Sequence, residues 1–169
     1  MSKPRTRFWS GTFGEWLAVF VVVAILVALF FPVRVGGGPS IRSACLSNVR
    51  QLSLGMLAYS GDWDGHAPIR DSWMDSIERY TRTERIDRCP AVKGVDVYGY
   101  AFNAGVAKLD LNASSASTTP LVYDSVNLGR NASDLVTSLP DPGRHQGKDC
   151  VAYTDGHARA IVPAKGGTP

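Results

Sequence analysis

The sequence predicts an α+β protein in which an N-terminal transmembrane helix precedes a small head domain, where one helix packs on a small antiparallel β-sheet. Three observations lead to this prediction. An unbroken apolar run fills residues 16–31, an amphipathic helical pattern covers residues 41–60, and a strand–turn–strand pattern surrounds Asp155-Gly156. The expected parts are a cytoplasmic lead (1–15), a transmembrane helix (16–33), a Gly/Pro hinge (34–40), a head (41–162) and a disordered tail (163–169).

The net charge of the chain comes from residues that precede the apolar run. The 169 residues include 18 Lys and Arg against 15 Asp and Glu, which gives a formal net charge of +3. Lys3, Arg5 and Arg7 account for this excess, so the rest of the chain is neutral by residue count. A nucleic-acid-binding surface needs a basic patch that neutralises phosphates. The even balance therefore argues against nucleic acid as a partner.

The apolar run has the composition of a membrane-spanning helix. Residues 16–31 read WLAVFVVVAILVALFF, without a charge, a glycine or a proline. As an α-helix this run rises about 24 Å, and Phe13 and Val33 extend it toward the ~30 Å of a bilayer core. It has no polar face, unlike a surface helix of a soluble domain. Because basic residues that flank such a helix stay in the cytoplasm, we expect a single-pass protein with a cytoplasmic N-terminus and an extracytoplasmic head.

Two other interpretations of this run remain open. A cleaved secretory signal has the same basic start, although its apolar region is usually about 7–15 residues long and a small-residue cleavage site follows it. That site is missing here. A helix buried in a protein core is the second interpretation, and the adjacent basic cluster and the unbroken apolarity both disfavour it.

A break separates the apolar run from the first helix of the head. Residues 34–40 read RVGGGPS, and glycine and proline both disfavour a continuing helix. A helix is then predicted over residues 41–60, because Ser40 can cap it and apolar residues recur at three- and four-residue steps. The residues of this stripe are Ile41, Cys45, Val49, Leu52, Met56 and Tyr59. We expect this stripe to lie on a core.

The middle of the chain combines short elements with loops. Residues 61–70 form a turn-rich loop, and a short helix is predicted around Ser72–Tyr80. Runs rich in aromatic and β-branched residues predict strands at Val97–Asn103 and Pro120–Ser125. Residues 127–149 are expected to be mostly loop.

A hairpin near the C-terminus is the clearest local element. Strand-like residues 150–154 and 157–162 flank Asp155-Gly156, a preferred pair for a two-residue type I′ turn with positive φ at both positions. With that turn, Tyr153 lies opposite Ala158. The residues that then share the core face are Val151, Tyr153, Ala158 and Ala160.

In this order, the segments resemble a known family. His145 is followed by nine residues and then by Asp155-Gly156. The other matching strings are CLSNVRQLSLGMLAYSGDWDGHAP (45–68), RCP (88–90), YGYAFN (98–103), LVYDS (121–125) and RHQGKDCVAYTDGHARAI (144–161). Together they are similar to type IV pilin-like proteins and type II secretion pseudopilins, and more narrowly to the bacterial group with a prepilin-type H-x9-DG domain. The resemblance covers most of residues 10–162.

The resemblance implies a role for the N-terminal residues in assembly at the bacterial inner (cytoplasmic) membrane. Glu15 matches the family glutamate that pairs with the N-terminal amine of a neighbouring subunit, and Pro32 matches the family's kink proline. Ser10 and Gly11 fall at the prepilin peptidase site, where the family carries Gly followed by Phe or Met. The candidate peptidase site is therefore degenerate. An acid at the membrane edge without a partner is the alternative explanation of Glu15.

The chain contains three cysteines on the side of the apolar run that we expect to be exported, where disulfides persist. Cys45 and Cys89 both lie in strings that match the family, and the resemblance therefore makes them the candidate disulfide pair. Cys150 lies inside a predicted strand and is expected to be a small core residue. Three buried, unbridged thiols are the alternative.

Histidines and aspartates offer a candidate metal site. His66, His145 and His157 could combine with Asp62, Asp64 or Asp155, yet none of them has a compact ligand spacing. The string DWDG at 62–65 is similar to the start of a calcium loop but lacks the bidentate glutamate downstream. A turn is the expected structure of this string, and the sequence predicts no metal and no cofactor.

Three functions follow from these patterns. The first is a structural subunit that assembles through its apolar N-terminal helix with identical or other pilin-like subunits and displays its head. The second is a signal-anchored extracytoplasmic binding module that does not assemble. The third is a small hydrolase that pairs His145 or His157 with Asp124 or Asp155, which the absence of any nucleophile motif disfavours. We expect the first function and no enzyme.

Overall fold

The computed structural model of the protein describes residues 13–30, 40–81, 85–113, 117–163. The chain forms two compact units, Met1–Gly38 and Pro39–Pro169. Each unit is described by itself below. The boundary between them falls within the glycine-rich break at residues 34–40 that the sequence marks as a hinge, although residues 31–39 of it lie outside the described part.

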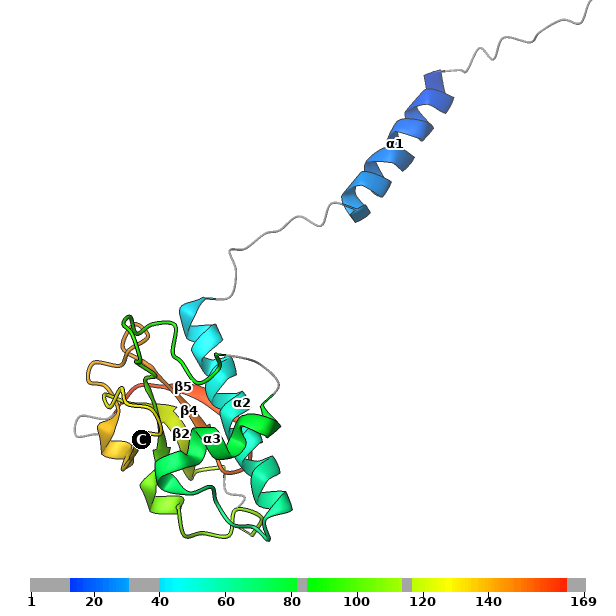
Figure 1. Cartoon of the computed structure of the whole chain (residues 1–169). Coiled ribbons are helices and arrows are strands. Elements are labelled where there is room, and N and C mark those ends of the chain that lie inside the picture. The colour runs from blue at the N-terminus through cyan, green and yellow to red at the C-terminus, as the bar shows by residue number, and fades with distance from the viewer. Residues whose placement is uncertain (1–12, 31–39, 82–84, 114–116, 164–169) are drawn as a thin grey trace, which may run out of the picture. The chain divides into compact units, whose positions relative to one another are not determined.

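The first unit contains helix α1 (Phe13–Phe30), drawn in blue in Figure 1. Glu15 lies in its first turn, and no basic residue lies in its last turn. From Phe13 to Val27, eleven large apolar side chains are between 47% and 87% exposed. Such exposure occurs on every side of the helix, so α1 has no face that its own unit covers in the described residues.

The expected transmembrane helix over residues 16–33 is wrong for the described part of the chain. No helix there combines the length and the apolarity that a bilayer crossing requires. Helix α1 has 18 residues, which rise about 27 Å along its axis. It also begins three residues before the predicted span and therefore includes Glu15, while residues 31–33 lie outside the described part.

The second unit begins with helix α2 (Ile41–Asp62), as the apolar stripe predicted. The side-chain oxygen of Ser40 accepts a hydrogen bond from the Ser43 backbone N–H at 3.2 Å, which caps the helix. Most of the stripe is buried, namely Cys45, Val49, Leu52 and Met56. Ile41, at the first position, is 55% exposed. The structure thus confirms this helix and extends it by two residues beyond the predicted end.

A five-stranded sheet forms the centre of the head, in the order β3-β1-β2-β4-β5. Its strands are β1 (Tyr100–Asn103), β2 (Pro120–Asp124), β3 (Ser133–Asp134), β4 (Asp149–Tyr153) and β5 (Ala158–Ile161). Three of the four pairings are antiparallel, but β3 runs parallel to β1. The expectation of a wholly antiparallel sheet is therefore wrong at this edge, where two residues of a predicted loop pair with β1.

Helix α2 packs on one face of the sheet, against β2, β4 and β5, as Figure 1 shows. The short helix α3 (Trp73–Ile77) joins this layer, and its Trp73 Nε1 donates a hydrogen bond to Ala132 O at 2.9 Å. A second apolar cluster fills the opposite face of the sheet. Its buried members are Ala101, Tyr123, Ala132, Leu139, Val151 and Tyr153. Ala132 and Leu139, from the loop-rich region between β2 and β4, therefore help to cover the face of the sheet on which α2 does not pack.

The C-terminal hairpin is where the sequence predicts it, but its register is shifted by one residue. Ala152, not Tyr153, lies opposite Ala158. Among the turn residues, Gly156 has a positive φ of 84° and Asp155 does not, so the connection is a three-residue loop with glycine in the left-handed position. A one-residue shift exchanges the two faces of a strand. Ala158 therefore packs on the α2 side, while Tyr153 belongs to the other cluster.

Candidate functional site

Five buried side chains from helix α2, two strands and two loops of the head meet near the start of α2. Cys45 comes from the second turn of α2, and Cys89 comes from the loop before β1. Asp124 ends β2, His145 lies in the loop before β4, and Cys150 lies in β4. None of them is more than 5% exposed. The fold thus brings all three cysteines of the chain together with one buried aspartate and one buried histidine.

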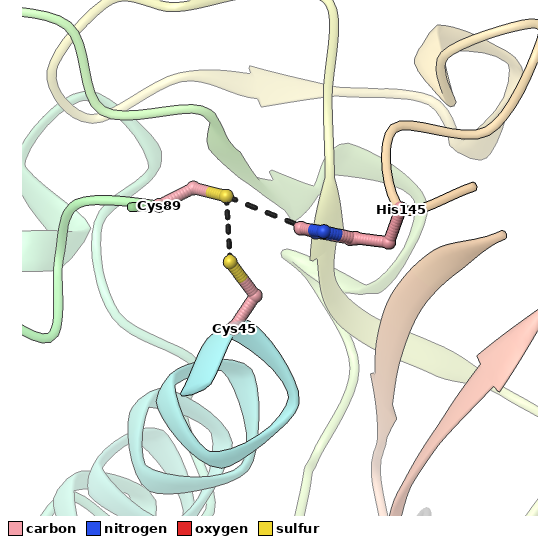
Figure 2. Close-up of side chains that lie close together, drawn as sticks. All are labelled: Cys45, Cys89 and His145. Atoms are coloured by element: carbon pink, nitrogen blue, oxygen red, sulfur yellow. Dashed lines mark hydrogen bonds between the residues drawn. The ribbon is translucent and has the colours of Figure 1, made fainter. Parts of the chain in front are cut away.

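The two predicted disulfide partners are in direct contact. Cys45 Sγ lies 2.7 Å from Cys89 Sγ, and Cys89 Sγ lies 3.8 Å from His145 Nε2. Figure 2 shows the three side chains pointing toward one another, with Cys45 on the helix and the other two on loops. Both cysteines are free thiols in this structure. The hydrogen bond from Cys45 lowers the pKa of Cys89 to about 6 and raises the pKa of Cys45 itself.

The Asp124 carboxylate accepts hydrogen bonds from several groups of the cluster. Its Oδ2 atom accepts a hydrogen bond from the Cys150 backbone N–H at 2.6 Å and lies 3.2 Å from His145 Nε2. Its Oδ1 atom accepts a hydrogen bond from Arg144 Nη1 at 3.2 Å. The hydrogen bond to Asp124 raises the pKa of His145, because it stabilises the protonated imidazolium. A fully buried carboxylate is thereby in contact with the Arg144 guanidinium and the His145 imidazole.

Arg144 extends this network into the backbone. Its guanidinium donates to Gly99 O at 2.7 Å and to Ser125 O, in addition to Asp124. Gly99 precedes β1 and Ser125 follows β2, so one side chain joins the ends of two neighbouring strands. Gly99 has a φ of 89°, and a Cβ there would come within 3.2 Å of the Arg144 guanidinium. Glycine at this position therefore allows the arginine to approach the backbone.

Asp149 is a second buried carboxylate beside the network. Its Oδ1 atom accepts a hydrogen bond from the Arg144 backbone N–H at 2.8 Å, whereas its Oδ2 atom has no hydrogen-bond partner among the described residues. Burial without a full set of partners disfavours the charged form and raises the pKa of Asp149 to about 6. This carboxylate therefore destabilises the folded head at neutral pH.

Comparison with known proteins bears on how this cluster is interpreted. No family model, no curated protein and no solved structure matches the chain. The resemblance to pilin-like proteins therefore stays a prediction from motifs. The chemistry of the cluster has to be inferred from its own geometry.

The motif His145, Asp155, Gly156 does not form a single site. His145 lies before β4 and contacts Asp124, whereas Asp155 and Gly156 lie in the turn after β4. Asp155 Oδ1 instead lies 2.5 Å from His157 Nδ1. The nine residues between His145 and Asp155 include strand β4, and the motif residues on the two sides of this strand have different structural roles. His145 anchors the buried network and Gly156 permits the turn.

Only one of the four N-terminal site residues lies among the residues that the structure describes. Glu15 lies in the first turn of α1. Ser10, Gly11 and Pro32 lie outside the described residues. The candidate peptidase site and the kink proline therefore stay predictions.

The metal combinations that the sequence offers do not come together in the described residues. His66 forms an isolated bridge with Asp110, and His157 stacks on Tyr153 with ring centroids 4.3 Å apart. Asp64 and Gly65 both have positive φ and form the turn expected for DWDG. The ligand atoms that do approach within 4.8 Å of one another form two other groups, Cys45 with Cys89 and His145, and Asp124 with His145 and Cys150.

Two of the acid–imidazole pairs that the hydrolase hypothesis allows are in contact, His145 with Asp124 and His157 with Asp155. His145 uses the same ring nitrogen, Nε2, toward Cys89 and Asp124, and its side chain is 3% exposed. A catalytic imidazole faces its nucleophile and its orienting acid with different nitrogens. His157 and Asp155 lie at an exposed turn.

Sequence reasoning missed Arg144 and Asp149. Arg144 directly precedes the motif histidine, and Asp149 is an acid at the start of a strand that is otherwise apolar. A charged residue at the edge of a buried strand is the signal that could have identified Asp149, because such a residue needs a partner. Nothing local in the sequence pairs Arg144 with residues 99 and 125.

Proposed function

We propose that the protein is a pilin-like structural subunit that assembles by packing its apolar helix α1 against the corresponding helices of neighbouring subunits. The observation that carries the proposal is the exposure of α1. Eleven of its large apolar side chains are 47–87% exposed, and Glu15 is the only ionisable residue of the helix. An α-helix that is apolar on all sides is normally buried.

The energetic argument favours a protein partner that covers several sides of α1. Burying one such side chain contributes about 1.5–3 kcal/mol. Because their own helix already covers part of these side chains, each one contributes only part of that amount, and the eleven together contribute a free energy on the order of the 5–15 kcal/mol that stabilises a folded domain. Identical helices from neighbouring subunits provide matching apolar surface along the whole length of α1, which a single shallow groove on a globular partner does not.

The proposal includes an exported head. The basic residues Lys3, Arg5 and Arg7 precede the apolar segment, an order that is typical of export signals. In the pilin-like mechanism that the resemblance implies, Glu15 then pairs with the new N-terminal amine of a neighbour. That pairing places an acid and an amine opposite each other in an apolar surrounding, where ion pairing is strong.

Site-specific photocrosslinking tests the assembly. A photoreactive phenylalanine analogue at position 20, which is a 72% exposed Phe, should join α1 to α1 of a second subunit. Val21→Asp should abolish this product, because it introduces a charge into the apolar contact. Val95→Asp is the matched control, since Val95 is 89% exposed on the head. Crosslinking to lipid alone, or an equal loss in both variants, would contradict the proposal.

The N-terminus of the mature protein separates assembly from the signal-anchored binding module. A mature chain that starts at Gly11, with a methylated amine, supports processing for assembly. An intact Met1 together with a monomeric product in the crosslinking experiment supports the binding module. Export is tested independently by fusing an enzyme that is active only outside the cytoplasm to the C-terminus.

A further inference from the structure

The contact between Cys45 and Cys89 is closer than two unbonded sulfurs allow. Unbonded carbon atoms rest about 3.5–4.0 Å apart, and sulfur is larger than carbon, whereas these two Sγ atoms are separated by 2.7 Å. A disulfide bond has a length of about 2.05 Å. The two sulfurs therefore need to approach by only about 0.65 Å, which small side-chain rotations provide.

A shared metal ion fits the two sulfurs less well. Two thiolates on one tetrahedral zinc, each at about 2.3 Å, lie roughly 3.8 Å from each other. The observed 2.7 Å separation is more than 1 Å shorter. Cys150 does not replace either partner, because its Sγ atom instead contacts Arg42 O at 3.7 Å and belongs to the group around Asp124. The geometry therefore selects one pair out of the three that three cysteines allow.

We propose that Cys45 and Cys89 form a disulfide bond that fixes the second turn of α2 to the loop before β1, while Cys150 stays a free thiol. The bond closes a loop between residues that are 44 positions apart. It joins the helix layer to the segment that leads into the sheet. The inference rests on the head alone and does not depend on the proposed assembly of α1.

The reaction needs an external disulfide as its oxidant. The thiolate of one cysteine attacks a sulfur of that disulfide, whose S–S bond breaks and releases one half as a thiol. The second cysteine loses its proton, and its thiolate then displaces the other half from the first sulfur. In total, two S–H bonds and the oxidant's S–S bond are lost, the Cys45–Cys89 bond forms, and the oxidant gains two electrons and two protons. Because both cysteines are at most 1% exposed in the folded head, this exchange takes place before the two residues become buried.

Peptide mapping of the full chain tests the pairing directly. The protein is refolded with oxidised and reduced glutathione, denatured without reductant, alkylated and digested, and its peptides are identified by mass. The expected result is one linked pair of peptides that contains Cys45 and Cys89, with alkylation at Cys150 only. Three alkylated cysteines, or a linkage that includes Cys150, would overturn the inference. One equivalent of bound zinc per chain, with no disulfide among the three cysteines, would overturn the inference as well.

Serine variants provide the second readout. Cys45→Ser and Cys89→Ser should lower Tm in non-reducing buffer by similar amounts, on the order of 10 °C, because each one removes the same crosslink. Reductant should lower the Tm of the wild type and of Cys150→Ser, which keeps the pair, but leave the other two variants unchanged. If reductant has no effect on the wild type, the bond is absent. Peptide mapping of the wild type decides the question even if a variant does not fold.

Discussion

The Oδ2 atom of Asp124 lies 3.2 Å from Nε2 of His145, and neither side chain is more than 3% exposed. The same oxygen accepts the Cys150 backbone N–H, and Arg144 bonds the other oxygen of this carboxylate. Asp124 therefore holds the end of β2, the start of β4 and the loop between residues 144 and 149 in one arrangement.

Removing the central acceptor should destabilise the head strongly. Asp124→Ala leaves the buried Arg144 and His145 groups without their acid, and breaking a buried pair costs about 3–5 kcal/mol. Asp124→Asn should cost less, because an amide oxygen can still accept the Cys150 N–H. Chemical denaturation of the full chain measures both. Asp96→Asn is the control, since the Asp96 side chain is 81% exposed, and a loss equal to that of Asp124→Ala would refute the assignment.

The contribution of His145 should depend on pH with a defined sign. The hydrogen bond to Asp124 raises its pKa in the folded state. The contribution is therefore complete below the ordinary histidine pKa of about 6.5 and disappears as pH rises through the raised value. Cys89 and Asp149 also interact electrostatically with the His145 imidazole, and both residues are present in the two proteins compared.

The measurement is the difference in unfolding free energy between the wild type and His145→Gln from pH 6 to pH 9, with reductant present. The difference should be largest at pH 6 and shrink toward pH 9. His66→Gln is the control, because His66 is exposed. A difference that stays constant or grows with pH would contradict the prediction.

Asp149 should act in the same pH direction for a different reason. Burial raises its folded-state pKa to about 6, so the folded protein binds a proton more tightly than the unfolded chain between about pH 4 and pH 6. Stability falls as pH rises through this window, and the cost persists above it. Asp149→Asn should therefore stabilise the chain by about 1–3 kcal/mol at pH 8, and by less at pH 4. Thermal melts at the two pH values test this; an Asn variant that is less stable at pH 8 would refute it.

Gly143 should tolerate no side chain. A Cβ at this position would lie 2.5 Å from Lys148 N and 2.6 Å from Gly147 C, both of which are backbone atoms. Gly143→Ala should therefore shift the loop that carries His145 and destabilise the chain by about 1–3 kcal/mol. Gly61→Ala in α2 is the matched control, since a Cβ there meets no atom within 4 Å. It should be neutral or stabilising by up to about 1 kcal/mol.

The elements that follow from local periodicity could be predicted from the sequence. The stripe from Cys45 to Met56 identifies α2, because its spacing specifies one buried face regardless of what covers it. The position of the hairpin could be predicted from the sequence, but the register of its two strands could not. Asp-Gly is compatible with more than one turn, and only the backbone shows that Gly156 alone adopts a positive φ. The two-residue strand β3 has no pattern of its own, since pairing with β1 defines it.

The candidate site is only partly predictable for a related reason. The amino-acid sequence identifies Cys45, Cys89 and His145 through a resemblance between ordered motifs, and it offers Asp124 only as one option for a hydrolase. Arg144 and Asp149 escape sequence reasoning because their partners lie on other strands and loops, at distances along the chain that no local pattern encodes. The transmembrane helix predicted over residues 16–33 is wrong for the described residues, because an apolar run fixes neither the bounds of a helix nor what covers it.

The two edges of the sheet limit how copies of the head can associate. At one edge, β3 has only two residues, too few to template a further strand. At the other edge, β5 carries the exposed Arg159, whose guanidinium lies over the Tyr153 ring of β4 at 5.0 Å. Short and charged edges are the means by which natural sheets resist strand addition and amyloid-like growth. The described edge at β3 therefore offers little backbone to which a second head could add a strand.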